Sequence, residues 1–137
     1  MQATLAANTN AITISTPRRW IGRVASALAV LFLALDGGIK VAQIAAATEG
    51  TMALGYGAHL VLPLGLLQLA CLALYCLPRT APLGAVLLTG YLGGAIATHV
   101  RVGSPVGSLI FPLILGALLW GGLYLRDARL RGLNPLN

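Results

Sequence analysis

The stretch that decides the fold is residues 55–77, GYGAHLVLPLGLLQLACLALYCL, which contains no Asp, Glu, Lys or Arg. As a helix it would be about 35 Å long, enough to cross the ~30 Å hydrocarbon core of a bilayer. It is followed by Pro78-Arg79-Thr80-Ala81-Pro82, and two prolines around an arginine end a helix and form a tight connection. The segment therefore predicts a membrane-spanning helix followed by a reversal of the chain.

Three further apolar runs accompany this one, at about residues 20–47, 83–100 and 106–125. The 137-residue chain is 58% hydrophobic and only 9% charged, and its mean hydropathy of +0.86 is too high for a soluble domain. Four apolar runs joined by short connections predict an all-α, up-down-up-down bundle of four transmembrane helices. We expect one membrane domain over residues 18–131, between a disordered tail at 1–17 and a C-terminal tail at 132–137.

The basic residues predict the orientation of this bundle. Seven of them fall on the side that carries both termini, against at most two on the other side. Because positively charged flanks stay in the cytoplasm, we expect cytoplasmic termini and a bacterial inner-membrane location. The seven are Arg18, Arg19, Arg23, Arg79, Arg126, Arg129 and Arg131, and the other two are Lys40 and Arg101. The sequence has no basic face with interleaved aromatic residues, so we do not expect a nucleic-acid partner.

Ionisable residues interrupt the apolar runs on the predicted outer side of the membrane. They are Asp36, Lys40, His59, His99 and Arg101. A charge near the bilayer centre costs about 2.5–3.5 kcal/mol on insertion scales, so an ionisable residue within a span is a functional-site candidate. The predicted topology brings all five to the outer half of the bundle, with Tyr56 in the connection beside them. We therefore expect a polar ligand-binding site in that half.

Each of these candidates is compatible with more than one role. Asp36 and Lys40 are four residues apart on a helix, so they can form a structural ion pair or a polar wall for a ligand headgroup. His59 and His99 can hydrogen-bond a quinone carbonyl, relay a proton or, in a further alternative, ligate a haem. Arg101 can anchor its helix at the interface or fold back over the site.

Other residues indicate packing rather than chemistry. Gly90 and Gly94 form a GxxxG pair, which permits close helix approach within the bundle or in a dimer, and we favour the bundle. Cys71 and Cys76 point in different directions on a helix, so neither a disulfide nor a metal site is expected. The sequence contains no nucleotide-binding, metalloprotease or hydrolase motif, and a self-contained enzyme is therefore not expected.

Several segments together resemble the DoxX-like family of small four-helix membrane proteins. They are Pro78-Arg79, the stretch LTGYLGGAIATHVR at 88–101, the ending LYLRDARLR at 123–131, and the step Gly38-Ile39-Lys40. The family takes its name from a subunit associated with a membrane complex that passes electrons to quinone, and some relatives are linked to thiol and oxidative-stress systems. The resemblance thus implies an accessory, redox-associated role. It does not carry a sulfur chemistry here, because no suitable cysteine pair is present.

Three functions remain open at this point. The chain can be an accessory subunit of a redox-linked membrane complex that binds a quinone or another lipophilic ligand in its outer half, with redox membrane subunits as partners. It can instead be a structural or assembly protein without a ligand. It can also be a small homodimeric transporter with Asp36 as the coupling acid, although an acid paired with Lys40 is a poor proton carrier.

Overall fold

The computed structural model describes residues 15–133 of the chain. Most of the predicted N-terminal tail and all but the start of the predicted C-terminal tail lie outside the described residues. Thr16 and Pro17 already belong to the first helix, where proline is well tolerated because the first helical N–H has no partner.

The described residues form helices and no strands, which confirms the predicted all-α class. Four helices are long and apolar enough to cross a membrane, if η1 is counted as the start of α3. These elements are α1 (Thr16–Val41), η1 (Ala58–Leu60), α3 (Val61–Cys76), α4 (Ala81–Arg101) and α5 (Val106–Arg126). Two short helices complete the described part, α2 (Ala45–Ala53) and α6 (Ala128–Gly132).

The end of α1 differs from the sequence-based expectation, which extended the first helix to about residue 47. The helix ends at Val41, and Gln43 adopts a positive φ of 52°. The N–H of Gln43 then bonds the Lys40 carbonyl at 3.1 Å, and the N–H of Ile44 bonds the Ile39 carbonyl at 3.1 Å. This pair of bonds is a Schellman motif, which terminates a helix and is usually formed by glycine. The chain therefore turns here and starts α2 as a separate helix.

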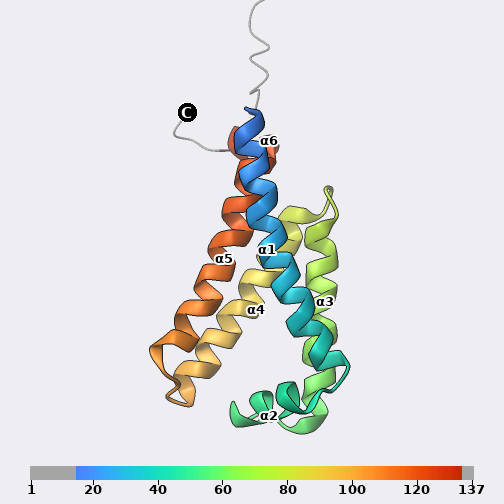
Figure 1. The fold of residues 1–137 in the computed structure, drawn as a ribbon, viewed down its shortest axis with the longest axis vertical. Coiled ribbons are helices and arrows are strands. Elements are labelled where there is room, and N and C mark those ends of the chain that lie inside the picture. Colours follow the sequence, from blue (N-terminus) through green and yellow to red (C-terminus); the bar gives the residue numbers. More distant parts are fainter. Residues whose placement is uncertain (1–14, 134–137) are drawn as a thin grey trace, which may run out of the picture.

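The four long helices form an antiparallel ring in the order α1, α3, α4, α5, with α5 closing back on α1 (Figure 1). We call the end that carries the start of α1, the α3–α4 connection and α6 the arginine end. The opposite end, which carries α2, η1 and the α4–α5 connection, is the α2 end. In Figure 1 α1 and α5 lie close together near α6 and diverge toward the end that carries α2.

Close backbone contacts hold the arginine end together. A Cβ added at Gly22 would lie 2.9 Å from the Gly122 carbonyl oxygen, and one added at Gly84 would overlap the backbone of Tyr75. Tyr75 is fully buried; its hydroxyl donates to the Leu119 carbonyl at 2.7 Å and lies 3.0 Å from the Ser26 hydroxyl. These contacts tie α1, α3, α4 and α5 at one level. Buried leucines pack beside them, among them Leu33, Leu72, Leu88, Leu115, Leu119 and Leu123.

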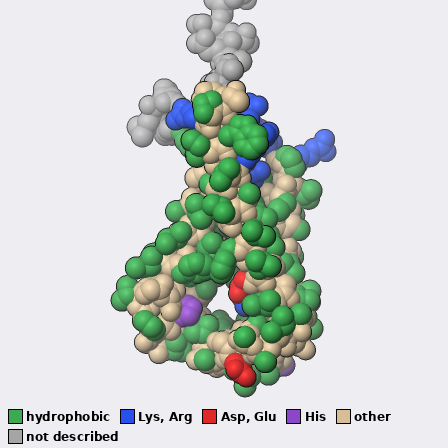
Figure 2. Space-filling model, in the orientation of Figure 1, with side chains coloured by type: hydrophobic (Ala, Val, Ile, Leu, Met, Phe, Trp, Pro, Cys, Tyr) green, Lys and Arg blue, Asp and Glu red, His purple; other side chains and the backbone are tan. Residues whose placement is uncertain are grey.

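The outer surface of the bundle is apolar. Large hydrophobic side chains are exposed along all four long helices, including Leu28, Leu35, Leu66, Val86, Leu113 and Ile114. Figure 2 shows hydrophobic side chains over the length of the bundle, with most of the basic side chains gathered near one end of the molecule. A soluble protein does not expose apolar surface on this scale, so lipid is the partner of these helices. The chain is accordingly an integral, multi-pass membrane protein.

Candidate functional site

The divergence of the helices leaves a cavity of about 480 Å³ at the α2 end. Residues of α1, α2, α3, α4 and α5 contribute to its wall, and Figure 2 shows an opening on this face of the molecule. The wall is mostly apolar. On one side the rings of Phe32 and Phe111 meet edge to face, with centroids 4.6 Å apart, and join α1 to α5.

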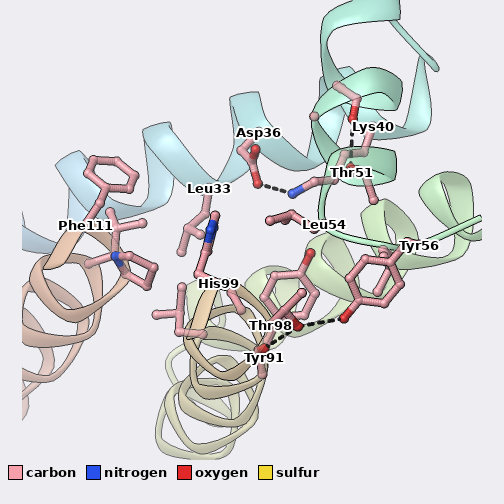
Figure 3. Close-up of a pocket in the computed structure, with 18 of the residues that line it drawn as sticks. Leu33, Asp36, Lys40, Thr51, Leu54, Tyr56, Tyr91, Thr98, His99 and Phe111 are labelled. Atoms are coloured by element: carbon pink, nitrogen blue, oxygen red, sulfur yellow. Dashed lines mark hydrogen bonds and ion pairs between the residues drawn. The ribbon is translucent and has the colours of Figure 1, made fainter. Parts of the chain in front are cut away.

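One polar cluster projects from α1 into this cavity (Figure 3). The Lys40 ammonium pairs with the Asp36 carboxylate and also donates to Oε1 of Gln68 at 3.1 Å. Gln68 is fully buried in α3, and its Nε2 donates to the Leu33 carbonyl at 2.9 Å. An ammonium has three N–H donors, so these two bonds leave Lys40 one donor for a ligand. Its Nζ also lies 5.9 Å from the ring centre of Tyr91, on the α4 wall.

A second polar group comes from α4 and the segment that follows α2. His99 lines the cavity, and its Nδ1 lies 2.9 Å from the Ser104 hydroxyl. Thr98 donates to the Gly94 carbonyl at 2.8 Å, so its oxygen accepts from the Tyr56 hydroxyl at 3.0 Å. When Ser104 donates to Nδ1, the proton of a neutral His99 ring is on Nε2, which then serves as a donor.

The structure thus brings together four of the six predicted site residues: Asp36, Lys40, Tyr56 and His99 line the cavity. His59 does not line it; this residue is exposed on η1, with its ring against Gly57. A haem held by both histidines needs both rings in one cavity, so these positions do not fit that alternative. Within residues 15–133 no cluster of three metal-ligating side chains occurs.

Arg101 also lies outside the cavity wall. Its guanidinium donates to the Leu54 carbonyl at 2.8 Å, and one of its nitrogens would lie 2.9 Å from a Cβ added at Gly55. Gly55 has a φ of +88°, which favours glycine, and that turn directs the chain from α2 toward Tyr56. Arg101 therefore bonds the turn that follows α2 to the end of α4, and it does not contribute its charge to the cavity wall.

Gly90 and Gly94, predicted as a helix-packing pair, also lie on the cavity wall. A Cβ added at either position would meet no atom within 4 Å. Close helix contacts occur instead at Gly22, Gly84 and Gly122, and between α1 and α3 at Gly37 and Gly65. The small residues of α4 thus leave open space where the sequence pattern predicted contact.

Sequence reasoning did not assign two residues of this site, Gln68 and Tyr91. Gln68 is the only amide in the apolar run of α3, and a lone amide among apolar residues is a usable signal for a buried hydrogen-bond network. Tyr91 lies seven residues before Thr98 and eight before His99, which places all three on one face of α4. The lining role of Thr51 and Leu54 had no signal, because α2 itself was not predicted.

The comparisons with known proteins support one assignment. The DoxX-like family model matches residues 24–122, a range that runs from α1 to α5 and includes Asp36, Lys40, Tyr91 and His99. No curated protein and no solved structure matches the chain. Because the family model covers most of the sequence and all four membrane-spanning helices, this membrane protein belongs to the DoxX-like family.

Proposed function

We propose that the protein is an accessory subunit of a redox-linked complex and that its cavity at the α2 end binds a quinone or a similar lipophilic carbonyl compound. With both termini in the cytoplasm of a bacterial inner membrane, this cavity lies in the outer half of the bilayer. The observation that carries the proposal is the combination of apolar walls with polar side chains on facing helices, Lys40 on α1 and His99 on α4.

This combination suits a quinone for two reasons. A cavity of about 480 Å³ is within the usual range for small-molecule sites, which are mostly apolar with a few placed polar groups. A quinone ring carries acceptors at opposite edges, and Lys40 and His99 supply donors from opposite walls. The aromatic rings of Phe32, Tyr91 and Phe111 offer surfaces for the quinone ring, and the exposed apolar exterior gives access for its lipid tail.

A structural role without a ligand is the second candidate, favoured by the network of Asp36, Lys40 and Gln68. Their hydrogen bonds join α1 to α3 and fix the relative position of these two helices, whether or not the cavity is occupied. A homodimeric transporter has less support, because Asp36 is bonded to Lys40 and an acid held in an ion pair is a poor proton carrier.

Filling the cavity distinguishes the quinone-binding role from the structural role without a ligand. A Cβ added at Gly94 or at the neighbouring Gly93 meets no atom within 4 Å, but only Gly94 lines the cavity, so leucine at Gly94 adds bulk to the cavity wall and leucine at Gly93 adds it outside. The purified protein in detergent is titrated with a decyl-tailed benzoquinone, and copurifying quinone is extracted and quantified. We expect Gly94→Leu to abolish binding and Gly93→Leu to preserve it.

The donor on α4 supplies a second arm of the experiment. His99→Ala removes one hydrogen bond, which corresponds to a roughly 2–10-fold loss of quinone affinity. Absence of quinone binding by the unaltered protein would reject the proposal, and so would equal affinities of the Gly94→Leu and Gly93→Leu proteins. Cooperative thermal unfolding of both leucine variants is the folding control.

A further inference from the structure

A second cavity, of about 330 Å³, lies at the arginine end and is separate from the proposed quinone site. It is bounded by the start of α1, the α3–α4 connection, the end of α5 and the residues that lead into α6. Four of its lining residues are arginines and one is an aspartate: Arg19, Arg23, Arg126, Arg129 and Asp127. The wall is therefore strongly positive.

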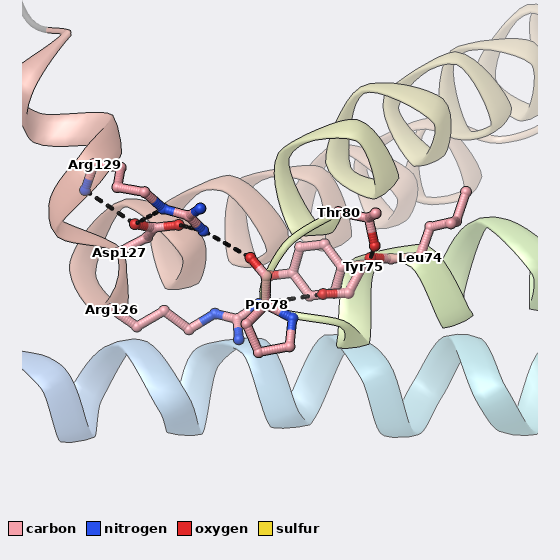
Figure 4. Close-up of polar contacts among 7 residues, drawn as sticks. All are labelled: Leu74, Tyr75, Pro78, Thr80, Arg126, Asp127 and Arg129. Carbon is pink, nitrogen blue, oxygen red and sulfur yellow. Dashed lines mark hydrogen bonds and ion pairs between the residues drawn. The ribbon is translucent and has the colours of Figure 1, made fainter.

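The aspartate of this wall is already neutralised by its neighbour (Figure 4). Arg129 bonds Oδ2 of Asp127 at 3.0 Å and Oδ1 at 3.2 Å, and its backbone N–H bonds Oδ1 at 3.0 Å. These hydrogen bonds lower the pKa of the Asp127 carboxyl below its ordinary value of 3.8. The same guanidinium donates to the Pro78 carbonyl at 2.7 Å, so the pair is fixed across the α3–α4 connection.

Arg126 also lines this cavity and contacts Tyr75. Its guanidinium carbon lies 5.0 Å from the ring centre of the buried Tyr75, and one of its nitrogens is 3.5 Å from the Tyr75 carbonyl oxygen. Its Nε is buried and has no hydrogen-bond partner within residues 15–133. A fixed, partly desolvated guanidinium with an unsatisfied donor favours a nearby anion.

Arg19 and Arg23 form the α1 side of the cavity. They are four residues apart, so they project from one face of the helix, and both are exposed. The ion pairs found among the described residues involve neither of them. Trp20 and Ile21, between them in sequence, are also exposed, as expected at a boundary between lipid and water.

We propose that this cavity binds a phosphate-bearing anion, with Arg19 and Arg23 contributing to its recognition beside the fixed Arg126. Guanidinium groups bind phosphate oxygens through paired N–H donors. Basic pockets between transmembrane helices at the cytoplasmic boundary suit anionic lipid headgroups. The headgroup of an anionic phospholipid and free phosphate share this chemistry, and the position beside exposed apolar residues favours the lipid.

A charge-matched pair of double variants tests the site. Arg19→Gln/Arg23→Gln removes two charges from the cavity wall, and Arg18→Gln/Arg79→Gln removes two exposed charges from the same end outside the wall. The full chain in neutral detergent is titrated calorimetrically with dihexanoyl phosphatidylglycerol below its micellar concentration. Dihexanoyl phosphatidylcholine and inorganic phosphate are titrated in parallel. All four substituted side chains are exposed, and thermal unfolding verifies that both variants fold.

Loss of charge-assisted hydrogen bonds predicts an affinity for phosphatidylglycerol at least about tenfold lower in the first variant, and a change below about threefold in the second. Tighter binding of phosphatidylglycerol than of inorganic phosphate supports the lipid headgroup as the source. Equal binding of those two supports the anion site and overturns the lipid assignment. Equal losses in the two variants, or equal affinities for phosphatidylglycerol and phosphatidylcholine, would overturn the site itself.

Discussion

The ion pair at the α2 end allows the structural and ligand-binding roles to be separated by a single series of variants. In Lys40→Met the Asp36 carboxylate loses its cationic partner, and Gln68 loses a hydrogen-bond donor. Removing one partner of a fully buried ion pair costs about 3–5 kcal/mol. The Asp36 side chain is 32% exposed and that of Lys40 only 16%. We therefore expect a smaller destabilisation, of about 2–3 kcal/mol, since water in the open cavity solvates part of the carboxylate.

The double variant Asp36→Asn/Lys40→Met removes both charges while it keeps side chains of similar size. It is expected to recover to within about 1 kcal/mol of the unaltered protein, because no unpaired charge remains in the bundle. It also lacks the ammonium that we propose as a quinone donor. The double variant should consequently be folded but bind the decyl-tailed benzoquinone about tenfold more weakly.

Reversible unfolding in mixed micelles, followed by circular dichroism, measures the stability changes, and quinone titration of each folded variant measures binding. Glu49→Gln is the matched control, since Glu49 is an exposed acid on α2 that makes no ion pair within residues 15–133. This control should change stability by less than about 0.5 kcal/mol. A double variant as unstable as Lys40→Met would refute the charge argument, and unchanged quinone affinity in the double variant would refute the donor role of Lys40.

Three further predictions concern the arginine end and can be checked by the same unfolding assay. Gly122→Ala should lower the free energy of unfolding by about 1–3 kcal/mol, because the added Cβ meets the α1 backbone. Gly121→Ala is the control: its Cβ meets no atom within 4 Å, so it should be neutral or stabilising. Similar effects of the two substitutions would contradict this packing. Hydrogen bonds from Arg129 lower the pKa of Asp127 from 3.8, so they should stabilise the folded protein fully above about pH 4 and lose this effect as the pH falls through the folded-state pKa. An Asp127→Asn protein whose stability has the same acid dependence would contradict this assignment. Ser26→Ala should cost about 1 kcal/mol by removing a buried hydrogen bond, and no loss of stability would show that this bond contributes little.

The fold was accessible from sequence because lipid imposes a simple requirement. Backbone groups inside the bilayer must bond within their own segment, so a long apolar run has to be a helix. The turns after Leu77 and Arg101 carry proline and glycine signals, and they occur close to where those signals predict. The end of α1 was misplaced because its cap uses Gln43 with a positive φ, a conformation usually signalled by glycine.

The sequence could predict which end of the bundle carries the candidate site residues, but not which of their side chains point into the bundle. Counting residues along each helix brings Asp36, Lys40, His59 and His99 to one end of the bundle, and the structure has them there. For Tyr56 and His59, the orientation of the side chain depends on the conformation of the connection between α2 and α3. In that connection Tyr56 turns inward to Thr98, whereas His59 is exposed. No single helical period covers this choice, since Tyr56 lies between α2 and η1, and His59 lies in the short 3₁₀-helix η1.

Glycine serves two purposes in this bundle, close helix contact at some positions and open space on the cavity wall at others. At the arginine end, Gly22 and Gly122 let α1 and α5 approach until their backbones touch, and Gly84 does the same for α4 against α3. Toward the α2 end α1 and α3 stay in close contact at Gly65, whereas Gly90 and Gly94 leave the α4 wall bare. Leucine side chains there would occupy this space and increase the buried apolar area, which generally stabilises a bundle. The small residues therefore leave space that the proposed lipophilic ligand would fill, and its binding would offset the packing that the bundle lacks there.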